Sequence, residues 1–186
     1  LKAYAQSRRI GVALARRYTG GTSVDSATEL ALGLHRQDGI QVSLFHLGEY
    51  VRSAAEVAAQ VAAKHAAIEA LGRAGLNVHV SVDPTQIGLL QGAPAFEANL
   101  RALATSVATA ARSGSGRPAL MLDMEDASVT DATLAGHAAL RETGLPAAIT
   151  LQAYRHRTGA DLARLVETGS MVRLVKGAFP AGPALA

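Results

Sequence analysis

The sequence has no cysteine and no tryptophan, and aromatic residues make up only 4% of its 186 residues. Without cysteine the chain can form neither disulfides nor a thiolate metal site, and it has no thiol nucleophile. This composition is typical of the reducing cytoplasm, where we expect the protein to lie. No apolar run approaches the roughly 18 residues that a membrane-spanning helix needs.

The sequence also has little excess of positive over negative charge. The net charge is +3, and the arginines are scattered without forming a basic stripe interleaved with aromatics, so no nucleic-acid partner is expected. The six histidines show no H-E-x-x-H or other metal-ligand spacing, and no metal site is predicted. No G-x-G-x-x-G follows the first expected strand, which argues against a Rossmann fold.

What the sequence does contain is a regular alternation of strand and helix patterns. Apolar segments predict strands at 40–45, 77–82, 119–124, 147–153 and 171–176. The helices are predicted to begin at Thr22–Ser23, Ser53, Pro94, Ser128 and Thr158, with capping boxes at Ser53, Ser128 and Thr158. Strands that are each separated by a helix indicate a parallel sheet in an α/β fold.

Polar residues recur at the carboxyl ends of the expected strands: Glu49, Asp83, Asp123, Gln152 and Lys176. In a (β/α)8 TIM barrel these ends form one face, and catalytic residues lie there. A doubly wound sheet and a barrel both fit the strand count, but the repeated polar ends favour the barrel. Because the sequence holds about five of eight βα units, the predicted barrel is incomplete.

The predicted organisation has three parts. A helical lead-in occupies 1–38, the βα units occupy 39–179, and a loop-like tail occupies 180–186. Because the sequence begins at Leu1 rather than at methionine, we interpret it as part of a longer protein.

The segment Val172–Phe179 is the most informative part of the sequence. An arginine inside an apolar strand is unfavourable unless it is paired or faces a ligand. Arg173 and Lys176 enclose two apolar residues, and Gly177 lets a ligand approach the backbone. This pattern predicts an anion held at the strand end. The alternative is a strand end whose lysine simply reaches solvent.

Five motifs, in the same order along the chain, resemble those of FAD-dependent proline dehydrogenases. They are Leu47-Gly48-Glu49, Thr85-Gln86-Ile87-Gly88, Asp123-Met124-Glu125, Gln152-Ala153-Tyr154 and Arg173–Phe179. The resemblance extends from about Arg17 to Phe179 and implies a (β/α)8 barrel whose first five units lie in this chain. It implies an oxidoreductase of proline catabolism that converts L-proline to Δ1-pyrroline-5-carboxylate, with hydride moving from C5 of proline to N5 of FAD.

The resemblance also implies partners and a location. The substrate is expected to be L-proline or a similar cyclic amino acid, and a quinone is expected to take the electrons from the flavin. Contact with a membrane quinone implies a cytoplasmic protein that touches the inner face of the membrane peripherally.

By position, the resemblance places FAD against Arg173, Val175, Lys176, Gly177 and Ala178, with Asp123 and Gln152 at the isoalloxazine ring. Glu49 corresponds to the acid that pairs with a substrate-binding arginine, and the expected catalytic residues are Asp83, Glu49 and Asp123. Cationic side chains suit this position because a reduced flavin is anionic or nearly so. The simpler alternatives are a solvated loop acid for Glu49 and a helix-capping acid for Asp123.

Three features depart from the family pattern. Asp83 stands where the family usually has a lysine at the end of the second strand. An anion there could draw the substrate ammonium closer or accept its proton, or it could mark an altered substrate or lost activity. Phe179 replaces the final tyrosine of its motif. The chain also stops before the family's last three strands and the final helix, whose arginine pair grips the carboxylate of proline.

Two other functions stay open from the sequence. A lysine at a barrel strand end is also how Schiff-base aldolases place their nucleophile, which would make Lys176 the nucleophile and Asp123 or Glu49 its acid–base partner. Alternatively, the chain is a degenerate relative that binds flavin without catalysis.

Overall fold

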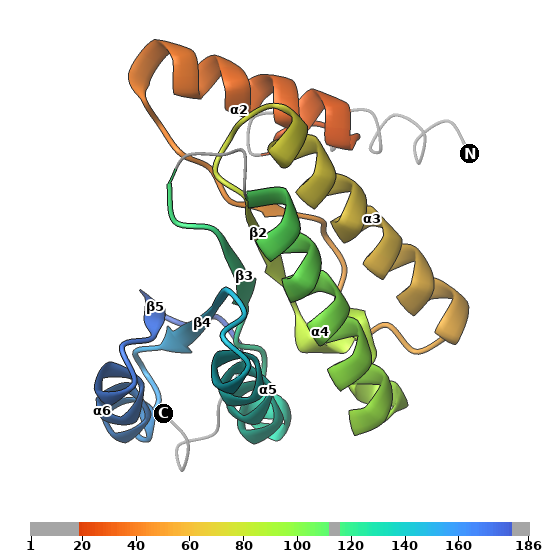
Figure 1. Cartoon of the computed structure of the whole chain (residues 1–186). Helices are drawn as coiled ribbons and strands as arrows, with labels where there is room; N and C mark the ends of the chain where they lie inside the picture. The colour runs from red at the N-terminus through yellow and green to blue at the C-terminus, as the bar shows by residue number, and fades with distance from the viewer. Residues whose placement is uncertain (1–18, 112–115, 180–186) are drawn as a thin grey trace, which may run out of the picture.

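Five parallel strands form one sheet in the computed structural model of the chain, in the order β1-β2-β3-β4-β5 (Figure 1). The structure describes residues 19–111 and 116–179. The strands are β1 (Leu44–Phe45), β2 (His79–Val82), β3 (Ala119–Leu122), β4 (Ala147–Gln152) and β5 (Met171–Val175). The strand order never reverses, as it does in a doubly wound sheet. It is the order of a (β/α)8 barrel, and the prediction of a parallel α/β fold is confirmed.

The helix α2 precedes the first strand, and the helices α3 to α6 each connect two consecutive strands. Within the described residues they are α2 (Val24–Asp38), α3 (Ala54–Arg73), α4 (Ala93–Ala110), α5 (Thr130–Glu142) and α6 (Thr158–Glu167). Short 3-10 turns occur at η1 (Pro84–Ile87), η2 (Leu89–Gln91) and η4 (Ala127–Val129). Figure 1 shows α3 and α4 side by side, with α5 and α6 further along the sheet. None of these helices combines the length and apolarity needed to cross a membrane.

The sheet is buried on both faces at its centre and open at its edges. Every residue of β3 and β4 is buried. On the helix side, Leu120 and Ile149 pack in the main apolar cluster with Leu71 of α3, all at 0% exposure. At the two edge strands, by contrast, Phe45 of β1 is 40% exposed and Leu174 of β5 is 54% exposed.

Several sequence expectations need correction at the ends of elements. Ser23 and Ser53 cap their helices as predicted, each accepting a hydrogen bond from the backbone N–H three residues later. The prediction of capping boxes at Ser128 and Thr158 is wrong. Ser128 donates to Asp126, which caps η4 instead, while α5 begins only at Thr130. Thr158 is the first residue of α6, and its hydroxyl donates to the buried carbonyl of Gln152.

The first strand is also shorter than the predicted 40–45. Only Leu44–Phe45 is regular strand, because β1 lies at the edge of the sheet and pairs with β2 at two positions. The lead-in before residue 19, the Ser-Gly segment at 113–115 and the tail at 180–186 lie outside the described residues. The three-part division of the chain therefore stays a prediction.

Candidate active site

Alternation along the strands brings the polar strand ends to one face. Side chains of a strand point in turn to opposite faces of the sheet. The small apolar cluster of Ala119, Met121 and Ala148 lies on the face away from the helices, which we call the inner face. Asp123 continues the series of β3, and its backbone N–H still bonds to Val82 of β2. The side chain of Asp123 therefore reaches the inner face at the carboxyl end of the sheet.

A charged cluster joins three neighbouring strands on the inner face. Asp123 Oδ1 accepts a hydrogen bond from Thr150 Oγ1 at 2.8 Å and another from the guanidinium of Arg173. Arg173 Nε donates to the same Thr150 hydroxyl at 3.1 Å. Arg173 lies opposite Thr150 in the register of β4 and β5. The arginine that the sequence marks as unusual is thus paired, and Asp123 binds these side chains rather than a helix end.

Gln152 carries a buried acceptor that has no donor in the described part of the chain. Its side chain is 3% exposed, and Nε2 donates to the carbonyl oxygens of Met124 at 2.9 Å and Glu125 at 3.3 Å. Oε1 has no hydrogen-bond partner there. A buried polar atom left without a partner is unfavourable by about 1–3 kcal/mol. Gln152 lies two residues beyond Thr150 on the same face, so this unpartnered oxygen belongs to a side chain next to the Asp123–Arg173 pair.

The segment after β5 is folded around Tyr154. Gly177 has a backbone φ of 105°, and a Cβ at this position would overlap the ring of Tyr154. The hydroxyl of Tyr154 donates to the carbonyl of Phe179 at 2.6 Å. Lys176 and Ala178 are exposed on this segment, and Val175 is half-buried. The structure thus positions the backbone of the expected flavin segment, while the roles of these side chains stay predictions.

Exposure of Lys176 bears on the aldolase alternative. A Schiff-base lysine becomes nucleophilic at neutral pH by desolvation in an apolar pocket or by a neighbouring cation. Lys176 is exposed to solvent, so residues 19–111 and 116–179 offer it no apolar pocket.

Glu49 lies at the rim, in a loop held by the neighbouring turn. It is exposed between Gly48, at φ 144°, and Tyr50, at the unusual φ of 53°. The backbone N–H of Tyr50 donates to Thr85 Oγ1 at 2.8 Å, and its hydroxyl donates to Asp126 at 2.6 Å. Burial and the hydrogen bond to Asp126 raise the pKa of Tyr50. These contacts fix the backbone directly after Glu49, whose side chain is exposed at the rim.

A buried acid, Glu125, ties the loops after β2 and β3 together. It is 1% exposed and accepts from the Thr85 N–H at 2.9 Å and from Thr85 Oγ1 at 2.6 Å. Burial raises the pKa of Glu125, and the two bonds from Thr85 oppose this rise. Glu125 belongs to the Asp-Met-Glu motif, yet its side chain serves the architecture of the loops.

Asp83 lies between β2 and η1, with an extended backbone. Its side chain is half-buried, and burial together with the carboxylates of Glu125, Asp123 and Glu49 raises its pKa to about 7. Lys64 of α3 acts in the opposite direction. The three residues expected to be catalytic therefore differ: Asp123 is paired, Glu49 is at the rim, and Asp83 is an acid poised near neutral pH.

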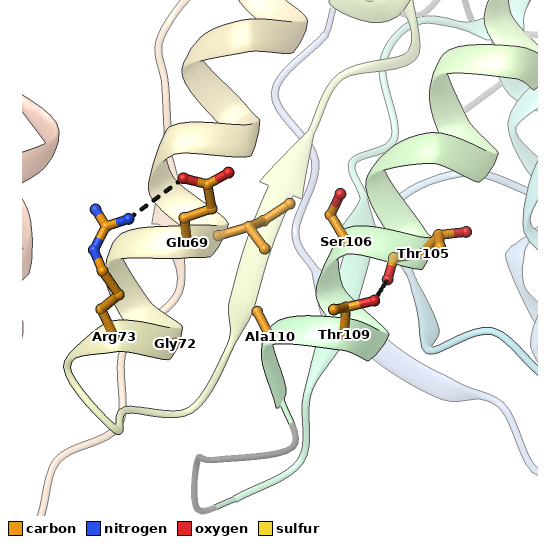
Figure 2. A pocket seen from close by; sticks show the side chains of 8 residues that line it. Glu69, Gly72, Arg73, Thr105, Ser106, Thr109 and Ala110 are labelled. Carbon is orange, nitrogen blue, oxygen red and sulfur yellow. Dashed lines mark hydrogen bonds and ion pairs between the residues drawn. The ribbon is translucent and has the colours of Figure 1, made fainter.

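Two hollows lie elsewhere on the molecule. One lies between α2, β1 and α3. The other, shown in Figure 2, lies between α3 and α4, with the Glu69–Arg73 ion pair on one side and Thr105 and Thr109 on the other. Neither hollow is lined by Asp83, Asp123 or the residues of β4 and β5. The candidate active site at the strand ends is therefore separate from both hollows.

Comparison with known proteins decides the family. The family model described as proline dehydrogenase matches residues 31–181. The chain belongs to the proline dehydrogenase family. Among the curated relatives of the chain, Proline dehydrogenase 1 of Bacillus subtilis (strain 168) is 32% identical over 185 residues, or 99% of this chain and 58% of that protein. Proline dehydrogenase of Deinococcus radiodurans is 32% identical over 168 residues, or 89% of this chain and 53% of that protein.

Solved structures agree on the fold. One is the crystal structure of proline utilization A (PutA) from Bdellovibrio bacteriovorus inactivated by N-propargylglycine. It matches with a TM-score of 0.70 and 21% identity over 86% of this chain and 20% of that chain. PutA from Corynebacterium freiburgense matches with a TM-score of 0.62 and 21% identity over 84% of this chain and 18% of that chain. The five βα units therefore have the arrangement of a TIM-barrel-like domain. The chain spans a little over half the length of the curated relatives named above.

Proposed function

We propose that the protein oxidises L-proline to Δ1-pyrroline-5-carboxylate with FAD, as a step of proline catabolism. The observation that carries the proposal is the inner-face cluster of Asp123, Thr150 and Arg173 beside the unpartnered oxygen of Gln152. Family membership supports the same reaction. When bound, FAD supplies the hydride acceptor, N5, and delivers the electrons to a quinone.

The residues present fit a flavin. Gln152 Oε1 is a buried acceptor without a donor among the described residues, and the N–H of a flavin ring is a donor of the kind it lacks. A guanidinium has five N–H donors, so Arg173 keeps donors beyond those that bind Asp123 and Thr150. We propose that Arg173, Val175, Lys176, Gly177 and Ala178 hold the cofactor along and after β5, with Asp123 and Gln152 at its ring.

We assign the proton step to Asp83. The ring nitrogen of free proline is an ammonium at neutral pH, and it must lose a proton before C5 can release a hydride. A general base works best when its pKa is near the working pH, and burial and neighbouring carboxylates raise the pKa of Asp83 to about 7. Asp83 accepts the N–H proton of the substrate, and its negative charge attracts the ammonium beforehand.

Glu49 is assigned to the substrate carboxylate side of the site. Its exposed position at the rim supports a pair with an arginine that grips the substrate. The exposed apolar side chains of the two edge strands support closure of the sheet by further βα units into an eight-stranded barrel. A quinone acceptor, a cytoplasmic location and peripheral contact with the inner face of the membrane are part of the same proposal, and rest on the family resemblance.

Purified complete protein tests the proposal directly. We expect flavin absorbance bands and reduction of an artificial dye that depends on L-proline, with D-proline as the control substrate. N-propargylglycine, which inactivates PutA from Bdellovibrio bacteriovorus, is expected to abolish this activity over time. Bound flavin without turnover would support the non-catalytic alternative. A colourless protein that borohydride links to a carbonyl substrate through Lys176 would support the aldolase.

A further inference from the structure

A single lysine interrupts the buried side of α3. The positions Val57, Val61, Lys64, Ile68 and Leu71 recur at three- and four-residue intervals, which places them on one side of the helix. Ile68 and Leu71 are 0% exposed in the main apolar cluster, and Lys64 is also 0% exposed. A lysine in this series is unusual, since lysines are almost never fully buried unless they are paired.

The buried side of α3 faces the carboxyl ends of β1 and β2. One turn before Lys64, Gln60 Oε1 lies 2.8 Å from the ring Nδ1 of His46, which follows β1. Gln86, in the turn that begins just after Asp83, donates to the carbonyl of His46 at 3.0 Å. The helix also packs against β2 and η1, the two elements on either side of Asp83. Figure 1 shows α3 running beside β2.

The ammonium group of Lys64 lies among these elements without a hydrogen-bond partner. Nζ is buried, it makes no hydrogen bond to the described residues, and it lies 5.7 Å from the ring centroid of Phe45. Phe45 is paired in register with Ser81, which is two residues before Asp83 on β2. A cation over an aromatic face gains only a modest electrostatic attraction. That gain is far smaller than the penalty for burying an unpaired ammonium.

The charges around Lys64 are acidic. Burial lowers the pKa of Lys64 to about 8, and the carboxylates of Asp83 and Asp123 oppose this decrease. The carboxylates of Glu125 and Asp123 after β3 and of Glu49 after β1 raise the pKa of Asp83, and Lys64 of α3 lowers it. Among these neighbours only Lys64 carries a positive charge, so it alone favours the ionised form of Asp83.

We propose that Lys64 is a positioning residue that keeps the carboxylate of Asp83 ionised and ready to accept the substrate proton. The inference rests on the proposed role of Asp83 as the proton acceptor. The cation that acts on this carboxylate comes from α3, the helix that packs against β2 and η1.

Infrared spectroscopy on the complete, flavin-loaded protein tests the pairing without using activity. The stretching band of a protonated carboxylic acid, assigned to Asp83 by its loss in Asp83→Asn, is followed against pH. In Lys64→Met we expect the midpoint of this band to move upward by about one pH unit. Lys64→Arg should restore the midpoint in part. Arg73→Met, which removes an exposed cation from the same helix, should leave it unchanged.

The pH profile of proline oxidation gives a second readout. The acid limb of kcat/KM should move upward by the same amount in Lys64→Met, while the plateau at high pH stays near that of the wild type. Equal midpoints of the Asp83 band in wild type and Lys64→Met would overturn the proposal. If wild-type protein fails to oxidise proline, the proposed function fails, and the infrared titration still decides whether Lys64 acts on Asp83.

A double-mutant cycle tests the proposal even if Lys64→Met is much less stable than the wild type. The unfolding free energies of wild type, Lys64→Met, Asp83→Asn and the double variant are compared at pH 8. Favourable coupling between the two positions is expected, because Asp83→Asn removes one of the two carboxylates, Asp83 and Asp123, that favour the charged form of the buried ammonium. Additive effects of the two substitutions would overturn the proposal.

Discussion

Asp123 and Arg173 form an ion pair across strand β4, although 50 residues separate them in the sequence. Thr150, on the intervening strand, donates to Asp123 and accepts from Arg173. The pair exists because β3, β4 and β5 are consecutive parallel neighbours, which brings the same face of each strand together. An unpaired arginine in an apolar strand would be unfavourable. In this pair Arg173 is stabilised, and its N–H donors have a fixed orientation at the strand ends.

Removing the guanidinium tests this role. We expect Arg173→Met to lower flavin affinity at least tenfold, because the variant loses both the charge and the N–H donors proposed for the cofactor. The unfolding free energy of the flavin-free protein should fall by only about 1 kcal/mol or less, since a partly exposed ion pair contributes little. Flavin titration and urea unfolding measure the two quantities. Arg164→Met, at an exposed position of α6, is the control, and equal flavin affinity in both variants would contradict the assignment.

Gln152 is expected to matter through its unpartnered oxygen. Gln152→Met keeps the size of the side chain but removes Oε1 and the donation to Met124 and Glu125. We expect flavin affinity to fall about tenfold, the equivalent of one net hydrogen bond. Thr133→Val is a matched control, since it removes a buried hydroxyl of α5 that donates to the carbonyl of Val129, the residue before this helix. Similar flavin affinity in the two variants would mean that Oε1 meets no donor of the cofactor.

Gly177 is expected to be intolerant of any side chain. Gly177→Ala places a methyl group against the ring of Tyr154 and keeps a φ of 105° that L residues rarely adopt. We expect a loss of about 1–3 kcal/mol in the unfolding free energy, measured in urea. In a Tyr154→Ala background the overlap is absent and only the backbone strain remains, so the same substitution should be less harmful. An equal loss in both backgrounds would show that Tyr154 is not the obstacle.

The inner-face residues were predictable because strand periodicity is a local property of the sequence. Val80 and Val82 alternate with Ser81 and Asp83, and the structure places the two valines in the helix-side core. Arg173 could likewise be singled out from its apolar neighbours. Its partner could not be derived from the spacing, because Asp123 is reached only through the packing of three strands.

The features that the sequence predicted wrongly or missed also depend on contacts that spacing alone does not show. The spacing of Thr158 fits a capping box. Its hydroxyl instead donates a hydrogen bond to the nearby carbonyl of Gln152, and α6 begins without a side-chain cap. Lys64 was missed although its helical spacing with Val57 and Ile68 was present in the sequence. Periodicity shows that this lysine faces the core, yet only the packing of α3 against β2 and η1 shows that Asp83 is near.

A buried histidine on α5 gives the last prediction, which concerns stability against pH. His137 is 2% exposed, and its Nε2 has no partner among residues 19–111 and 116–179. Burial and the charge of Arg141 lower its pKa from 6.5 to about 4 in the folded protein. Between these two values the unfolded chain binds the proton more readily than the native one. The contribution of neutral His137 to stability is therefore complete above pH 6.5 and is lost as the pH falls towards 4.

The size of this effect is on the order of 3 kcal/mol, since each unit of pKa difference corresponds to about 1.4 kcal/mol. It is measured as the difference in unfolding free energy between wild type and His137→Leu across that pH range. Asp83 and other buried acids also titrate there, with the opposite sign for Asp83, but they cancel in the difference because both proteins contain them. His156→Leu, at an exposed position, should follow the wild-type curve. A constant difference between wild type and His137→Leu from pH 7 to pH 4 would show that His137 titrates normally in the native state.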